Sequence, residues 1–205
     1  TYIHIDGAIG SKFNDKIIGS EYFDILDGKE GDDEIHGMGG DDYITGGAGN
    51  NKLYGEEGND IFHLDEGNNE VDGGDGIDRV DYKNYKKAEY EELVRFYNLM
   101  QEGMLLPEKE GDKLPNIDFI QEGVVVNLKE GKATKVKELV DILVNIEDVT
   151  GSEFNDIITG DDKNNHIVGL NGNDKVYAGA GDDTIVAGNG ENIIYAEEGN
   201  DLIIG

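Results

Sequence analysis

Acidic and amide side chains recur every nine residues along most of this chain. Lines of nine residues, such as DGKEGDDEI (27–35) and HGMGGDDYI (36–44), carry Asp or Asn at the seventh place and an apolar residue at the ninth. Carboxylate and carbonyl oxygens are the ligands of hard cations, and calcium accepts six to eight of them in tolerant geometry. Gly-rich turns let backbone carbonyl groups point inward. The spacing therefore predicts a series of calcium sites along the chain.

The repeat runs in two blocks, eight lines from Ile9 to Val80 and six lines from Thr150 to Ile203. All fourteen ninth places are apolar, and all fourteen seventh places are Asp or Asn. A chance product of Gly- and Asp-rich composition would not keep several residue classes in phase through both blocks. The candidate metal ligands are the seventh-place residues Asp15, Asp24, Asp33, Asp42, Asn51, Asp60, Asn69, Asp78, Asp156, Asn165, Asp174, Asp183, Asn192 and Asp201.

Short extended segments must position these side chains. Three residues around each ninth place can be extended, whereas the Gly-, Asp- and Asn-rich remainder is turn-forming. Strands of three residues are stable only if successive lines stack into parallel ladders and bury their apolar residues in a common thin core. The sequence thus predicts an all-β fold, a calcium-loaded parallel β-roll (solenoid) of nonapeptide repeats in two blocks, with a small helix-containing insertion between them.

Four segments are expected along the chain. They are a first β-roll block at 1–82, a helical and loop insertion at 83–122, linking strands at 123–149, and a second block at 150–205. Apolar residues at helical spacing predict a helix of about 85–102 in the insertion. VVVNL (124–128), KEGK and ATKVK predict a hairpin or two strands at the edge of the roll. Because residues 2–15 resemble residues 143–156, we expect two copies of one module, the second truncated after six lines.

Charge and composition restrict the partners. Acidic residues number 46 against 17 basic ones, and the net charge of −29 argues against nucleic acid and anionic membranes. The chain has no Cys, hence no disulfide or thiolate metal site, and its apolar runs are too short for a membrane span. High charge with modest hydrophobicity also predicts that the chain fails to fold without counter-ions.

Motifs for catalysis are missing. The chain contains no H-E-x-x-H of a zinc protease and no G-x-S-x-G. Paired carboxylates can serve as acid and base in glycoside hydrolysis. However, carboxylates outside the seventh places, such as Asp32 and Asp41, are more simply a solvated acidic surface in a repeat where nearly every loop has them. We therefore expect no enzymatic activity in this segment, whatever catalytic domain a longer parent protein carries.

Three of the lines also carry a family signature. GGAGNNKLY (46–54), GEEGNDIFH (55–63) and GGDGIDRVD (73–81) fit G-G-x-G-x-D-x-U-x, the calcium-binding nonapeptide of RTX proteins. The chain resembles this family, the haemolysin-type calcium-binding repeats, over residues 9–80 and 150–204. The resemblance implies two lines per turn of a flattened roll and export by a bacterial type I system. The expected location is then extracellular, secreted or at the bacterial cell surface.

Two lines per turn would stack seventh places eighteen residues apart into columns, so that an ion between two loops is shared by two side chains. One column of the first block holds Asp24, Asp42, Asp60 and Asp78, and the other holds Asp15, Asp33, Asn51 and Asn69. The columns of the second block hold Asp156, Asp174 and Asn192, and Asn165, Asp183 and Asp201. The strongest sites are expected along the all-Asp column and between Asp183 and Asp201. The weakest is expected at the pair Asn51 and Asn69.

Two functions remain open from the sequence. In the first, the segment belongs to a larger secreted bacterial protein such as a toxin, protease or lipase, and folds on calcium binding outside the cell to support secretion and stability. Its partners are then calcium ions, the type I secretion machinery in transit and adjoining domains. In the second, the segment is a calcium-rigidified piece of an adhesin, whose insertion or surface contacts a host, a glycan or a neighbouring domain.

Overall fold

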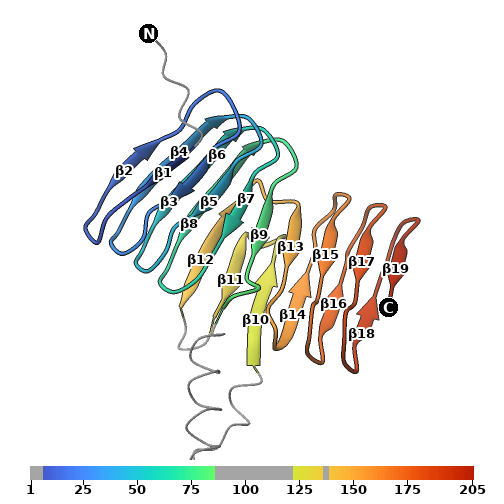
Figure 1. The fold of residues 1–205 in the computed structure, drawn as a ribbon. Helices are drawn as coiled ribbons and strands as arrows, with labels where there is room; N and C mark the ends of the chain where they lie inside the picture. Colours follow the sequence, from blue (N-terminus) through green and yellow to red (C-terminus); the bar gives the residue numbers. More distant parts are fainter. Residues whose placement is uncertain (1–6, 86–121, 136–138) are drawn as a thin grey trace, which may run out of the picture.

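The computed structural model describes residues 7–85, 122–135 and 139–205. The regular elements in these ranges are all β-strands, which form two sheets that run along the length of a roll (Figure 1). The described residues contain no helix, and hence none long and apolar enough to cross a membrane. The helix predicted for about 85–102 falls, apart from residue 85, outside the described residues. The all-β class is confirmed.

The first sheet, called sheet A, has nine strands in the order β1-β3-β5-β7-β9-β13-β15-β17-β19. Its strands are β1 (Gly7–Ile9), β3 (Ile25–Asp27), β5 (Tyr43–Thr45), β7 (Ile61–His63), β9 (Arg79–Asp81), β13 (Asp148–Thr150), β15 (His166–Val168), β17 (Thr184–Val186) and β19 (Leu202–Ile204). All neighbours in this sheet are parallel.

The second sheet, called sheet B, has ten strands in the order β18-β16-β14-β10-β11-β12-β8-β6-β4-β2. Its strands are β2 (Lys16–Ile18), β4 (Glu34–Gly39), β6 (Lys52–Glu57), β8 (Glu70–Asp75), β10 (Glu122–Asn127), β11 (Lys132–Thr134), β12 (Val140–Val144), β14 (Asn155–Thr159), β16 (Lys175–Tyr177) and β18 (Ile193–Tyr195). Neighbours are parallel except that β11 is antiparallel to both β10 and β12.

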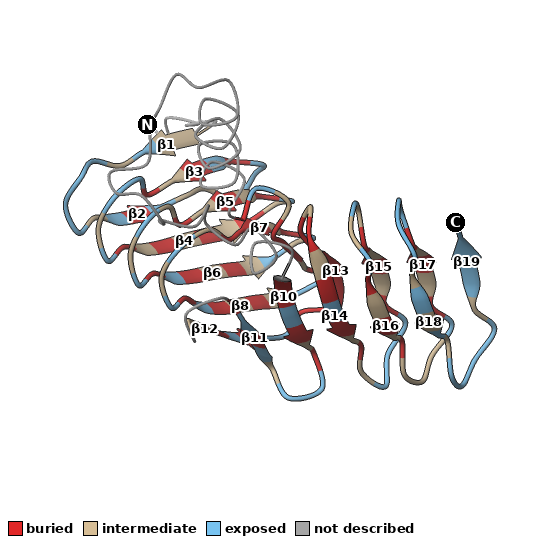
Figure 2. Ribbon diagram, turned by 90° about the horizontal axis from the view of Figure 1, so that it is seen from below, coloured by how far each residue is buried: buried red, intermediate tan, exposed pale blue. Residues whose placement is uncertain are grey.

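One turn of the roll takes eighteen residues. Leu26 pairs with Ile44, and Ile44 pairs with Phe62. These ninth-place residues face the interior and are buried, as are the others except Ile194 and Ile203 in the last turn. Figure 2 shows the buried residues recurring from strand to strand in both sheets. The predicted parallel roll with two nine-residue lines per turn is therefore confirmed.

The two blocks form one continuous roll. Sheet A passes directly from β9 to β13, with Val80 paired to Val149. In sheet B, β12 adds to β8 and completes a turn with β13, but β10 and β11 then lie between β12 and β14. They form the predicted hairpin, with Val126 paired to Ala133. Because neighbouring strands are about 4.8 Å apart, this hairpin lengthens sheet B alone by about 10 Å, and the two blocks are set at an angle (Figure 1).

Glycine at the fifth place of a line is required by both the turn and the stacking. Gly49 has a φ of 136°, in a region that residues with a side chain rarely adopt. A Cβ at this position would also overlap the carbonyl oxygen of Gly31, the equivalent glycine one turn earlier. A larger residue there would force neighbouring turns apart and with them the loops that hold the seventh-place side chains.

Candidate metal sites in the loop columns

The stacked turns bring the seventh-place side chains into columns. The backbone N–H of Asp42 donates to Asp60 Oδ1 at 2.8 Å, and that of Asp60 donates to Asp78 Oδ1 at 2.8 Å. Equivalent bonds, from a backbone N–H to a side-chain oxygen eighteen residues later, join Asp24 to Asp42, Asp15 to Asp33, Asp33 to Asn51, Asn51 to Asn69, Asp156 to Asp174, Asp174 to Asn192, Asn165 to Asp183 and Asp183 to Asp201. One oxygen of every column side chain after the first in its column thus helps to hold successive turns in register.

Most of these side chains are buried. Eleven of the fourteen candidate ligands are buried, namely Asp24, Asp33, Asp42, Asn51, Asp60, Asn69, Asp78, Asp156, Asn165, Asp174 and Asp183. The other three, Asp15, Asn192 and Asp201, are half-buried and lie toward the two ends of the roll. Acidic residues are seldom fully buried unless they are paired, so a series of buried carboxylates requires a source of positive charge or protons.

The second oxygen of most column carboxylates has no partner in the protein. These buried oxygens are Oδ1 of Asp24 and Oδ2 of Asp33, Asp42, Asp60, Asp78, Asp174 and Asp183. Leaving a buried acceptor without a hydrogen bond costs about 1–3 kcal/mol, and more when the group is charged. Oxygens that recur unpaired in equivalent loops are therefore the candidate positions for a cation.

Burial also changes the acidity of these groups. It raises the pKa of Asp42 and Asp78 to about 7, and the neighbouring carboxylate of Asp60 adds to the shift of both. The pKa of Asp60 rises to about 6, again chiefly because of burial. In the second block, burial raises the pKa of Asp174 to about 7 and that of Asp156 to about 6. Without a cation, the folded columns thus hold protons more tightly than ordinary Asp residues do.

Glycine at the second place of a line lets the unpaired oxygen lie close to the backbone. A Cβ at Gly55 would overlap Asp60 Oδ2 and the carbonyl oxygen of Gly73. A Cβ at Gly37 would overlap Asp42 Oδ2 in the same way. A larger residue at the second place would therefore displace the unpaired carboxylate oxygen.

Two of the four column Asn residues, Asn51 and Asn192, donate to carbonyl oxygens of their own loops. Asn51 Nδ2 donates to the carbonyl oxygens of Gly47 and Gly49 at 3.3 and 3.4 Å. Asn192 Nδ2 donates to Ala187 O and Gly188 O at 3.1 and 3.3 Å. In an Asp loop, the equivalent side-chain atom is an oxygen, which cannot donate to these carbonyls. The loops of Asn51 and Asn192 thus satisfy carbonyl oxygens that no column side chain can satisfy in an Asp loop.

The groups that could bind an ion in these loops are oxygens, and few of them belong to side chains. Among the described residues, no group of three or more His, Cys, Asp or Glu side chains comes together to hold a metal ion. Each loop supplies one seventh-place side chain, so an ion between two loops has to complete its shell with backbone carbonyl oxygens or water. Calcium accepts such a shell, whereas structural zinc requires His or Cys ligands. The residues present therefore fit calcium.

A second set of ladder bonds corrects one prediction. Asp32 and Asp41 are exposed but are not simply solvated, because Asp32 Oδ1 accepts from the N–H of Asn50 at 2.9 Å and Asp41 Oδ1 from that of Asn59 at 2.8 Å. Asn50 Oδ1 in turn accepts from the N–H of Asn68 at 3.0 Å. These are sixth-place residues, and their side chains link turns on the outside of the loops. The sequence contains a signal for these bonds, because all but three of the fourteen sixth places are Asn or Asp.

The fold and these loops define a class of protein, a parallel β-roll with columns of Asp- and Asn-bearing loops along its sides. A model of the RTX calcium-binding nonapeptide repeat (4 copies) matches residues 9–44, 18–53, 36–71, 45–80, 150–185 and 177–205. These matches cover more than half of the chain, which therefore belongs to this family. The resemblance seen in the sequence is confirmed, and the family is typical of proteins that bacteria secrete. No match was found among curated proteins.

Proposed function

We propose that this segment is a calcium-binding β-roll that folds when it meets calcium outside the cell, and that it thereby supports the secretion and stability of a larger bacterial protein. The observation that carries the proposal is the series of buried carboxylate oxygens without a partner, repeated from loop to loop. Membership of the RTX repeat family supports calcium as the ion. A bound calcium ion supplies positive charge beside these oxygens.

Folding and ion binding are coupled in this proposal. Seventh-place residues of one column are eighteen residues apart, so the unfolded chain holds no formed site, and the free energy of ion binding becomes free energy of folding. At low cytosolic calcium, repulsion within a chain of net charge −29 opposes the compact state. An unfolded chain suits passage through a type I secretion system, and extracellular calcium then drives folding.

The proposal assigns no catalysis to this segment. Asp42, Asp60 and Asp78 lie in equivalent loops and make equivalent backbone contacts. Any reaction of the parent protein is therefore assigned to a separate domain.

A calcium titration tests this proposal. In chelator we expect a far-UV circular dichroism spectrum dominated by coil, and on addition of calcium a cooperative gain of β signal with a midpoint of about 10⁻⁴–10⁻³ M, the range of extracellular calcium modules. Magnesium is the control, because it keeps its waters and demands octahedral geometry, and we expect it to induce little structure at the same concentration. A chain equally β-rich in chelator and in calcium would refute the proposal.

One observation favours the second function, a calcium-rigidified adhesin segment. Sheet B exposes apolar side chains on its outer face around the hairpin, with Val125, Ile157 and Ile193 between 42% and 53% exposed. They line a groove of about 650 Å³ together with Lys175. A surface of this kind suits contact with a host, a glycan or a neighbouring domain. The sequence that flanks this segment distinguishes the two functions. A catalytic domain there favours the first function, and many further copies of the module favour the second.

A further inference from the structure

One column continues across the junction of the two blocks through Asp141. The N–H of Asn69 donates to Asp141 Oδ1 at 2.8 Å, as the N–H of Asn51 donates to Asn69 Oδ1 one turn earlier. Asp141 lies in β12, seventy-two residues after Asn69 in the chain rather than eighteen. It therefore takes the place of a seventh-place side chain although it belongs to no nonapeptide.

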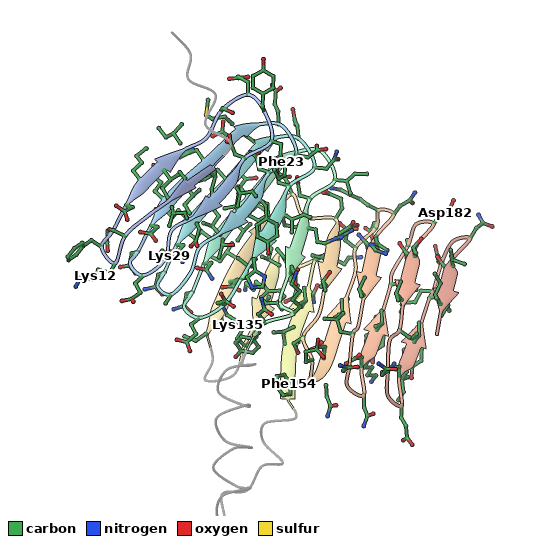
Figure 3. The ribbon with its side chains drawn as sticks, in the orientation of Figure 1. Lys12, Phe23, Lys29, Lys135, Phe154 and Asp182 are labelled. Carbon is green, nitrogen blue, oxygen red and sulfur yellow. The ribbon has the colours of Figure 1, made fainter. Side chains whose placement is uncertain are left out.

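An ammonium group lies between Asp141 and the loop that precedes β8. Lys135, which directly follows β11 (Figure 3), donates from Nζ to Asp141 Oδ1 at 3.0 Å and to the carbonyl oxygen of Asp65 at 2.8 Å. Asp65 is the third residue of its line, as Gly47 is two lines earlier, and Gly47 O is a carbonyl that Asn51 Nδ2 contacts. Lys135 thus contacts the two kinds of oxygen, loop carbonyl and column carboxylate, that an ion between two loops would contact.

This pair is buried, and both oxygens of Asp141 are hydrogen-bonded. The side chains of Lys135 and Asp141 have no exposed surface. The remaining oxygen, Asp141 Oδ2, accepts from the hydroxyl of Tyr82 at 3.0 Å. Asp141 therefore has no unpartnered oxygen, in contrast to Asp42 and Asp60 in the regular loops. Burial of an ion pair is tolerated only when its geometry and further hydrogen bonds compensate the loss of water, and this pair meets that condition.

We infer that Lys135 is a resident cation, whose ammonium group takes at the junction the position that calcium takes between Asp loops, so that the junction binds no ion there. This inference rests on the proposed function, because it assumes that calcium binds in the regular loops. The other side of the roll shows a weaker form of the arrangement. Lys163 Nζ donates to Glu147 Oε1 at 2.5 Å, and Glu147 Oε2 accepts from the N–H of Asp78. Because the Lys163 side chain is 58% exposed, we assign the role to Lys135 alone.

Counting calcium ions per chain by equilibrium dialysis at saturating calcium tests the inference. We expect Lys135→Ala to bind one ion more than the wild-type chain, because the substitution opens a position between Asp141 and the carbonyl oxygen of Asp65. The matched control is Lys129→Ala, which removes an exposed ion pair with Asp162 from the same hairpin and should leave the count unchanged. An equal or lower count for Lys135→Ala overturns the inference.

A second variant decides the matter if Lys135→Ala stays unfolded. The double variant Lys135→Met, Asp141→Asn removes both charges and keeps their bulk. We expect it to fold in calcium with the ion count of the wild-type chain. A count lower by one would mean that Asp141 binds calcium. Failure of the double variant to fold would mean that charge neutralisation is not what Lys135 supplies. Either result overturns the inference. A wild-type chain that binds no calcium would instead refute the proposed function.

Discussion

Asp60→Asn is expected to weaken calcium binding by about tenfold or more at the two positions that share this carboxylate, equivalent to at least about 1.4 kcal/mol per position. Asp60 is fully buried between Asp42 and Asp78, and its Oδ2 has no partner in the protein. Calcium affinity follows the charge of the ligands as well as their number, and Asn keeps one oxygen but no charge. The measurement is calorimetric titration with calcium, combined with the calcium midpoint of folding.

Asp32→Asn is the matched control for this substitution. It removes the same charge from an exposed sixth-place residue, whose Oδ1 accepts from the N–H of Asn50. Asn preserves that acceptor, as the bond from the N–H of Asn68 to Asn50 Oδ1 demonstrates. We therefore expect little change in calcium affinity. If Asp32→Asn weakened binding as much as Asp60→Asn, the column carboxylates would matter only through the net charge of the chain.

Lowering the pH is expected to induce part of the folding that calcium induces. In the metal-free roll, burial raises the pKa of Asp42, Asp78 and Asp174 to about 7, above the value of about 3.9 for an exposed Asp. The folded state then binds more protons than the unfolded chain. The stability that these protons contribute is fully present below about pH 4 and is lost as the pH rises through about 6 to 7. In chelator, far-UV circular dichroism should therefore show β signal increasing from pH 8 to pH 5. In saturating calcium the signal should change little over this range.

General relief of charge repulsion would act in the same direction, so a control is needed. Asp42→Asn, Asp78→Asn removes two of the groups with raised pKa, whereas Asp32→Asn, Asp41→Asn removes two exposed charges. We expect the first pair of substitutions to flatten the pH dependence in chelator and the second to leave it nearly unchanged. A metal-free roll that loses β structure between pH 8 and pH 5 would contradict the account of buried, proton-binding columns.

The nine-residue period predicted a stacked parallel roll, and the resemblance to the RTX family supplied its register of two lines per turn. Apolar ninth places such as Leu26 and Ile44 recur at a spacing that only stacked parallel strands can bury together, and they pair as predicted. The same register places Asp42, Asp60 and Asp78 in one column. Their burial could not be predicted, because it depends on how the loops close over the side chains. The sequence also could not show that Asn51 supplies its own donor to the loop carbonyls.

The junction was not predictable, because its contacts join residues at irregular separations. Asn69 contacts Asp141, and Lys135 contacts Asp65, across about seventy residues of chain. No period links these residues, and a Lys in the linking strands has the same appearance in sequence as an exposed one such as Lys129. Their proximity follows from the pairing of β12 with both β8 and β11, which only the three-dimensional strand order reveals.

A crystal structure of the calcium-loaded chain, with anomalous scattering used to locate calcium, tests most directly whether the column carboxylates are the ion sites. The account predicts anomalous peaks beside Oδ2 of Asp42, Asp60 and Asp78, and a weaker peak or none in the loop of Asn51. Equal occupancy of the Asp and Asn loops, or calcium located away from the unpartnered carboxylate oxygens, would contradict it.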